Sequence, residues 1–252
     1  MFSSARAQGI LSEESLETLT GTEDLGAAIQ DALGTPADDI DASEVFLLTQ
    51  LVDDSGSIRF GSNAQYVRDG HNLIIDALSG SKSENDILAS ASALNKGLIY
   101  AYGPLKNVPR LDNKNYDPSG GTPLYDQTIV TLGTVLAKER EFATQAGVPV
   151  RTITLIITDG NDEGSRKRAA DVLPIVRDML KRENHIIGAM GIDDGSTDFR
   201  KVFGEMGIDD KWILTPKNDP KSIREAFVVF SKSSVQASKG AASFSKMGGF
   251  NP

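Results

Sequence analysis

Small oxygen-bearing side chains gather directly after an apolar segment in the first quarter of the chain. Residues 45–52, VFLLTQLV, are typical of a buried strand, and the next five residues are DDSGS. Asp53, Ser55 and Ser57 stand at alternate positions there. A strand that ends in this way places one carboxylate and two hydroxyls around a single turn, where they could bind a cation.

Two further loops carry the same kinds of side chain. The segment 117–126, DPSGGTPLYD, contains Thr122 at the end of a glycine-rich run and leads into a helix. The segment 158–164, TDGNDEG, contains Asp159 directly after the apolar run ITLIIT. None of the three loops contains a histidine, and the chain has no cysteine. Such oxygen ligands suit a hard cation, and Mg²⁺ prefers six of them and keeps some water.

Strand and helix patterns alternate from about residue 44 onward. The expected strands are residues 45–52, 87–91, 97–102, 152–158, 186–192 and 212–214, and the expected helices are 62–78, 123–145, 169–183, 198–206 and 220–232. This order predicts an α/β fold with a doubly wound, mostly parallel central sheet, one antiparallel edge strand and helices on both faces. The C-terminal ends of the central strands face one crevice in such a sheet, so we expect the three loops to meet there.

The pattern Asp53-x-Ser55-x-Ser57, then Thr122, then Asp159 in a TDG triplet, resembles the metal-ion-dependent adhesion site (MIDAS) of von Willebrand factor A (vWA) domains. All five positions are present in order, and the resemblance covers about residues 44–232. It implies a Rossmann-like vWA fold in which Ser55, Ser57 and Thr122 coordinate the metal directly, while Asp53 and Asp159 act mainly through water. It also implies that an acidic residue of a ligand completes the coordination shell.

The resemblance implies a binding domain and not an enzyme. Such a domain uses bound Mg²⁺ or Mn²⁺, with Ca²⁺ as a further candidate, to bind a Glu or Asp of a partner protein. Bacterial cytosolic members of the family often work beside AAA+ ATPases of the MoxR or chelatase type, which gives a class of partner.

A phosphatase of the haloacid-dehalogenase-like class is the alternative. Such enzymes also place an aspartate after an apolar strand and a hydroxyl at the end of a second strand, here Thr158. They need a second aspartate two residues after the nucleophile as acid and base. That position is Ser55, and a serine hydroxyl cannot supply the proton near neutral pH.

The charge of the chain limits the class of partner. The chain has 252 residues and a formal net charge of −9, which argues against nucleic-acid binding because phosphate contacts need a basic surface.

The N-terminal residues MFSSARAQG lack the apolar core of a signal peptide, and no later segment is long and apolar enough to span a bilayer. The lack of cysteine fits a reducing compartment. These features favour a cytoplasmic protein that binds neither nucleic acid nor membrane.

Composition divides the chain into three parts. Residues 1–43 are polar and acidic, and we expect an arm with two short helices, one over 13–19 and one capped by Thr22. Residues 44–232 are expected to form the vWA domain. Residues 233–252 are rich in Ser, Gly and Ala, which predicts a flexible tail.

Ordinary structural roles are expected for the other polar residues. Helix capping by the serines and by Thr122, and a turn at Asp159-Gly160, would each explain one loop without a metal. Asp54 and Asp162 are expected to be exposed. Packing or local capping is expected for His71, His185 and Trp212. The loop 191–198 is expected to lead into a helix capped by Ser196 or Thr197. The basic run 166–168 is expected to form the solvated face of a helix.

Overall fold

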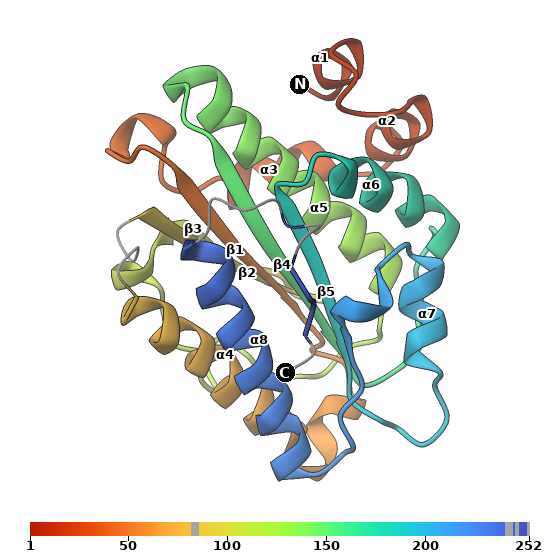
Figure 1. Ribbon diagram of the computed structural model, residues 1–252. Coiled ribbons are helices and arrows are strands. Elements are labelled where there is room, and N and C mark those ends of the chain that lie inside the picture. Colours follow the sequence, from red (N-terminus) through yellow and green to blue (C-terminus); the bar gives the residue numbers. More distant parts are fainter. Residues whose placement is uncertain (82–85, 240–243, 245–246, 251–252) are drawn as a thin grey trace.

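A six-stranded sheet forms the centre of the protein (Figure 1). The computed structural model describes residues 1–81, 86–239, 244 and 247–250. The strand order is β3-β2-β1-β4-β5-β6, and every neighbouring pair is parallel except the β2–β3 hairpin at one edge. The strands are β1 (Val45–Val52), β2 (Ile87–Ala93), β3 (Gly97–Pro104), β4 (Val150–Thr158), β5 (His185–Gly191) and β6 (Ile213–Leu214). The expected fold class is confirmed.

The central strands β1 and β4 are apolar because helices cover both faces of the sheet. Every residue of β1 is buried, and so are all but one of the residues of β4. Val52 at the end of β1 pairs with Ile157 near the end of β4. Both strands therefore end at the same edge of the sheet, where Asp53 and Asp159 follow them.

Helices α4 and α8 pack side by side on one face of the sheet, and α3, α5 and α6 lie on the other (Figure 1). The helices are α1 (Phe2–Ala7), α2 (Glu13–Thr20), α3 (Leu25–Ala32), α4 (Asn63–Ser79), α5 (Leu124–Glu141), α6 (Ala169–Lys181), α7 (Phe199–Glu205) and α8 (Pro220–Lys239). A Cβ at Gly70 of α4 would lie 2.3 Å from the ring of Phe227 in α8, so only glycine allows these helices to pack so closely. Among the described residues, no helix is both long and apolar enough to cross a bilayer.

The N-terminal arm packs on the layer of helices that contains α5 and α6. The Ser12 backbone N–H and the Ser15 hydroxyl both donate to the carboxylate of Asp178 in α6, at 2.6 and 2.7 Å. The buried ammonium group of Lys138 in α5 donates to the carbonyl of Thr35 at 2.5 Å. These bonds attach the arm at two places, while domain boundaries at residues 43 and 232 remain predictions.

Helices α3 and α6 begin differently from the expectation. Asp24, and not Thr22, directly precedes α3, because the Thr22 hydroxyl donates to the carbonyl of Thr18 at 2.8 Å. The basic run 166–168 lies before α6 and not on its surface, with Arg168 as the N-cap residue. Helix α1 was not expected from the sequence.

The start of α7 is capped by a different residue from the two expected. Asp198 is the N-cap, and its side chain accepts a hydrogen bond from the N–H of Lys201. The hydroxyls of Ser196 and Thr197 instead donate to Asp194, at 3.0 and 2.6 Å. The loop is thus a local turn, as expected, with a different cap.

The last helix is longer than expected, since α8 ends at Lys239 and not near residue 232. Its final turns bury the small residues Ser234 and Ala237, and Arg151 of β4 donates to the carbonyl of Ala237 at 2.6 Å. Of the expected flexible tail, residues 240–243, 245, 246, 251 and 252 lie outside the described residues. Phe250 is buried, and its ring centroid is 5.0 Å from that of Trp212.

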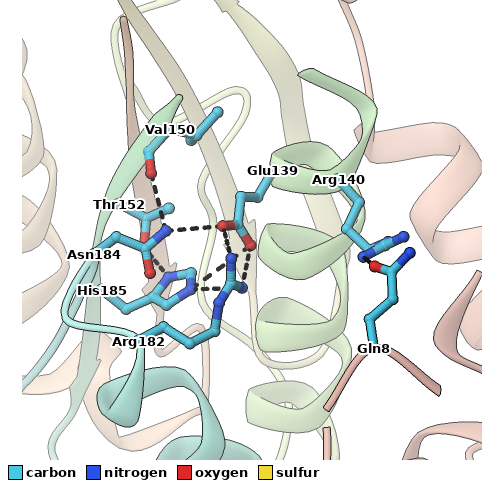
Figure 2. Close-up of polar contacts among 8 residues, drawn as sticks. All are labelled: Gln8, Glu139, Arg140, Val150, Thr152, Arg182, Asn184 and His185. Carbon is cyan, nitrogen blue, oxygen red and sulfur yellow. Dashed lines mark hydrogen bonds and ion pairs between the residues drawn. The ribbon is translucent and has the colours of Figure 1, made fainter. Parts of the chain in front are cut away.

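A buried polar network joins the start of β5 to the ends of α5 and α6, at the edge of the sheet opposite to the three loops (Figure 2). Glu139 accepts hydrogen bonds from Arg182 at 2.6 Å and from Asn184 at 2.8 Å. Arg182 can only donate, so His185 Nε2, 3.3 Å away, must accept. The ring proton is therefore on Nδ1, which donates to the hydroxyl of Thr152 at 2.7 Å. This arrangement requires a neutral histidine.

Acid is expected to destabilise the protein through its two buried histidines. Burial lowers the pKa of His185 to about 4, and burial together with the charge of Arg110 lowers the pKa of His71 to about 3, from the ordinary 6.5. Below pH 6.5 the unfolded chain therefore binds protons that the folded chain does not, so the free energy of unfolding falls as the pH falls towards 4. For His185 alone we expect a loss of roughly 2 kcal/mol between pH 7 and pH 5.

Urea unfolding at pH 7 and at pH 5 measures this loss. The His185→Gln variant lacks the titrating group but keeps all other ionisable residues. It should lose roughly 2 kcal/mol less than the wild type over the same interval. Equal losses in the two proteins would mean that His185 does not titrate differently in the folded and unfolded states.

Candidate metal-binding site

The three polar loops meet at the edge of the sheet where β1 and β4 end. Gly56 in the first loop donates its N–H to the carbonyl of Gly120 in the second, at 2.9 Å. Thr122 in the second loop and Glu163 in the third exchange two backbone hydrogen bonds, of 3.2 and 2.8 Å. Backbone hydrogen bonds therefore join the second loop to both the first and the third.

Side chains of the first and third loops are linked by short hydrogen bonds. The hydroxyls of Ser55 and Ser57 are 2.8 Å apart, and Ser57 donates to Asp159 Oδ1 at 2.6 Å. Asp53 Oδ1 accepts from the N–H of Ser55 at 2.7 Å, and its Oδ2 accepts from the hydroxyl of Thr158 at 2.6 Å. Four of the five residues selected from the sequence thus form one connected group.

Thr122 brings a hydroxyl from the second loop to the same edge. It lies two residues after Gly120, which is bonded to the first loop, and its side chain is buried. A Cβ at Gly120 would lie 2.1 Å from the side chain of Asn95, so the close approach of the second loop requires glycine there.

The two carboxylates of the group are in an environment that disfavours negative charge. Burial, and to a smaller extent the charge of Asp159, raises the pKa of Asp53. Burial and the charge of Asp194 raise the pKa of Asp159. Hydrogen bonds to both groups oppose these shifts without cancelling them, and no described lysine or arginine forms an ion pair with either carboxylate. A cation bound beside them would supply the missing positive charge.

The oxygen atoms fit a small divalent cation. Adjacent ligands of an octahedral ion with ~2.1 Å metal–oxygen bonds lie ~3.0 Å apart. The distance from Ser57 Oγ to Ser55 Oγ is 2.8 Å, so a small shift would bring these two oxygens into such a shell. Among the residues that the structure describes, no three His, Cys, Asp or Glu cluster as a metal site. A metal at this edge would therefore depend on serine and threonine hydroxyls.

No protein-family model and no curated protein matches the sequence, but solved structures match the fold. The pilus adhesin SpaC of Lactobacillus rhamnosus GG, in its open conformation, superposes with a TM-score of 0.54 and 14% identity, over 78% of this chain and 31% of the adhesin. The SpRpn10 VWA domain superposes with a TM-score of 0.51 and 9% identity, over 74% of this chain and 95% of that domain. The chain has the fold of a vWA domain.

A third structure, proximal thread matrix protein 1 of the mussel byssus, superposes on this chain with a TM-score of 0.50 and 13% identity. The match covers 78% of this chain and 47% of the matrix protein. The matched region thus spans less than half of the adhesin and of the matrix protein, but nearly all of the SpRpn10 domain. At these identities the likeness concerns the fold alone.

Asp54 is a buried structural residue of this vWA fold, and the expectation that it is exposed was wrong. Its Oδ1 accepts from the backbone N–H and the side-chain amide of Asn95, at 2.7 and 3.0 Å, and its Oδ2 accepts from the N–H of Lys96 at 3.1 Å. Its carbonyl accepts from the N–H groups of Ser119 and Gly120. Asp54 therefore connects the first loop both to the β2–β3 turn and to the second loop.

Two further residues of the vWA fold contact the site and were not singled out from the sequence. Asn63, the first residue of α4, is buried and donates to Asp159 Oδ2 at 3.5 Å, while its own Oδ1 has no partner among the described residues. Tyr116 is buried and donates to the carbonyl of Asp53. A polar residue at the first position of an amphipathic helix was the available signal for Asn63, whereas nothing in the sequence distinguished Tyr116.

Charged residues surround the site. Asp162 was expected to be exposed but is half-buried, and it accepts from the N–H of Tyr125 at 3.2 Å. Arg59 donates to the carbonyl of Pro118 at 2.8 Å, and the Lys96 ammonium donates to the carbonyl of Asp117 at 2.5 Å. The second loop is therefore bordered by two cationic side chains from other segments.

Proposed function

We propose that the chain is a metal-dependent protein-binding domain. Ser55, Ser57 and Thr122 would hold Mg²⁺ or Mn²⁺ directly, with Ca²⁺ as a further candidate, and Asp53 and Asp159 would act mainly through water. The observation that supports this proposal is the hydrogen-bonded group of two hydroxyls and two uncompensated carboxylates from two loops, beside a third loop that carries Thr122. Once bound, the cation would supply a positive centre that attracts a carboxylate.

The hydrogen bonds of Asp53 support a role for a partner's carboxylate. Both of its oxygens already accept protein hydrogen bonds, from Ser55 and Thr158, so this side chain is poorly placed to bind a metal directly. Hydroxyl ligands carry no charge. Direct ligation by hydroxyls would leave much of the charge of a divalent ion uncompensated, and a Glu or Asp of a partner protein would compensate it.

The proposed partner is a bacterial cytoplasmic protein, specifically an AAA+ ATPase of the MoxR type. The resemblance to cytosolic vWA domains supports this class, and the net charge of −9 disfavours nucleic acid. Recovery of the partner from the native cell with immobilised protein tests it. The partner should be retained in Mg²⁺ and released by EDTA, and retention in EDTA would contradict metal-dependent capture.

Calorimetric titration of Mn²⁺ tests the metal site itself. The wild-type protein should bind one ion, and Asp53→Ala should weaken binding by about 10–100-fold because the carboxylate holds the hydroxyl ligands and the metal's water in place. The exposed Asp39→Ala provides a control for loss of one negative charge, and its affinity should equal that of the wild type. Equal heats in the wild type and Asp53→Ala would end the proposal.

The phosphatase alternative has a specific structural difficulty. Asp53 would have to be the nucleophile, but it has 0% exposure and both its oxygens are engaged in hydrogen bonds. Hydrolysis of p-nitrophenyl phosphate in Mg²⁺ discriminates between the two functions. A binding domain should show no activity above buffer, whereas activity lost in Asp53→Asn would support the enzyme.

A further inference from the structure

Helix α5, which begins two residues after Thr122, takes its N-terminal caps from a distant segment of the chain. The residue before the helix is Pro123, whose side chain cannot accept a hydrogen bond. The N–H groups of Tyr125 and Asp126 instead donate to the hydroxyl oxygen of Ser165, at 3.1 and 3.2 Å. The first N–H groups of a helix have no partner within the helix, so these bonds fasten the start of α5 to the end of the third loop.

Asp126 makes the same kind of contact in the opposite direction. Its two carboxylate oxygens accept from the backbone N–H groups of Arg166 and Lys167, at 2.9 Å each. Hydrogen bonds to a charged acceptor are stronger than those between neutral groups. Asp126 from α5 and Ser165 from the loop region therefore cap each other's segments and form an interlock.

The Ser165 hydroxyl is fully used in this interlock. Its oxygen accepts the two N–H groups of α5, and its hydrogen is donated to Asp162, which itself accepts from the N–H of Tyr125 at 3.2 Å. A serine hydroxyl has one hydrogen and two lone pairs, so all three positions are occupied. The start of α5 and the third loop are thus held in one relative position.

The interlock lies next to the backbone bridge that carries Thr122. Thr122 and Glu163 exchange backbone hydrogen bonds of 3.2 and 2.8 Å, and Asp126 follows four residues after Thr122. One bridge alone would let the second loop pivot, whereas a second attachment further along the chain fixes its direction. The position of the Thr122 hydroxyl relative to Asp159, in the third loop, therefore depends on both attachments.

Asp126 is poorly placed to bind a cation itself. Both of its oxygens already accept backbone N–H groups, and its side chain is half-buried. Direct ligation would require these bonds to break. An effect of Asp126 on metal binding would therefore act through the segments that it holds.

We propose that Asp126 is a positioning residue of the metal site. With Ser165, it holds the hydroxyl of Thr122 at the distance from Asp159 that a bound cation requires. This inference rests on the proposed metal-dependent function. It gives a role in metal binding to a side chain outside the five residues selected from the sequence.

Calorimetric titration of Mn²⁺ into the full chain, with urea unfolding of the same preparations, tests this role. Asp126→Ala should weaken Mn²⁺ binding by about tenfold, the lower end of the effect of removing a residue that orients a metal ligand. In a protein that already carries Thr122→Ala, the same change should weaken binding by less than about twofold, because the hydroxyl that Asp126 positions is absent. A residue that acted through its charge or through overall stability alone would weaken binding by the same factor in both backgrounds.

Ser165→Ala provides a milder second variant if Asp126→Ala fails to fold. It removes neutral hydrogen bonds at a half-buried position, so binding should weaken by about threefold, again only when Thr122 is present. Asp117→Ala removes an exposed carboxylate of the second loop and should bind Mn²⁺ like the wild type.

Two results would overturn the role of Asp126 while leaving the metal site in place. They are wild-type Mn²⁺ affinity in Asp126→Ala and equal weakening with and without Thr122. Absence of Mn²⁺ binding to the wild type would instead overturn the proposed function, and this inference with it.

Discussion

Replacing Glu139 with alanine is expected to lower the free energy of unfolding by about 3 kcal/mol, the lower end of the range for breaking a buried ion pair. The change removes the carboxylate acceptor of Arg182 and one of the two acceptors of Asn184, at a position where the Glu139 side chain is 5% exposed. Removing one partner costs more than the pair contributes, because the remaining charge stays partly buried. We take the lower end because the Arg182 side chain keeps 26% exposure, and water can solvate part of its charge.

Urea unfolding at neutral pH measures this loss, with Glu225→Ala as the matched control. Glu225 forms an ion pair with Lys221 at 3.9 Å, in which both side chains are largely exposed. Its loss should change stability by less than about 1 kcal/mol. If both glutamate variants lost the same small amount, the network in Figure 2 would contribute no more to stability than a surface pair.

Replacing Asp54 with alanine is expected to cost about 3 kcal/mol of stability and to weaken Mn²⁺ binding by about tenfold. Asp54 accepts three hydrogen bonds from Asn95 and Lys96, and its removal leaves those donors without an acceptor. The effect on Mn²⁺ assumes the proposed metal site. It arises because Asp54 positions the loop that carries Ser55 and Ser57, although it is not a proposed ligand.

Urea unfolding and Mn²⁺ calorimetry on the same preparations separate the two effects. Asp117→Ala is the control, since Asp117 lies in the second loop with a side chain that is 63% exposed. Its stability should change by less than about 1 kcal/mol, and its Mn²⁺ affinity should stay close to that of the wild type. Wild-type Mn²⁺ affinity in Asp54→Ala would show that the loops keep their positions without this carboxylate.

Much of the fold could be predicted because its signals are local. The run 45–52 is apolar throughout, as a strand covered on both faces must be, and the order of strands and helices specifies a mostly parallel sheet. Helix ends were less predictable, since they depend on competing contacts. Thr22 has the right side chain for a cap, but its hydroxyl donates to the carbonyl of Thr18. Helix α8 extends to Lys239 because the small side chains of its last turns can be buried.

The candidate site was likewise predictable in its residue types and less so in the contacts between its residues. The residue types at positions 53, 55, 57, 122 and 159 indicate oxygen ligands for a hard cation, and their places at strand ends or at a helix start predicted that they share one edge of the sheet. The structure brings the three loops together there. Whether these residues bind a metal remains a prediction that the Mn²⁺ titration tests.

The sequence by itself determined the alternation of strands and helices and the chemistry of the oxygen-bearing loops, because periodicity and residue type are properties of short segments. Only the tertiary structure decided which acids are buried and what they contact. Asp53 and Asp54 are neighbours with identical side chains, yet the first accepts from Ser55 and Thr158 and the second from the β2–β3 turn. The difference arises because burial depends on which distant segments pack against each side chain, and that is settled only when the sheet and its loops assemble.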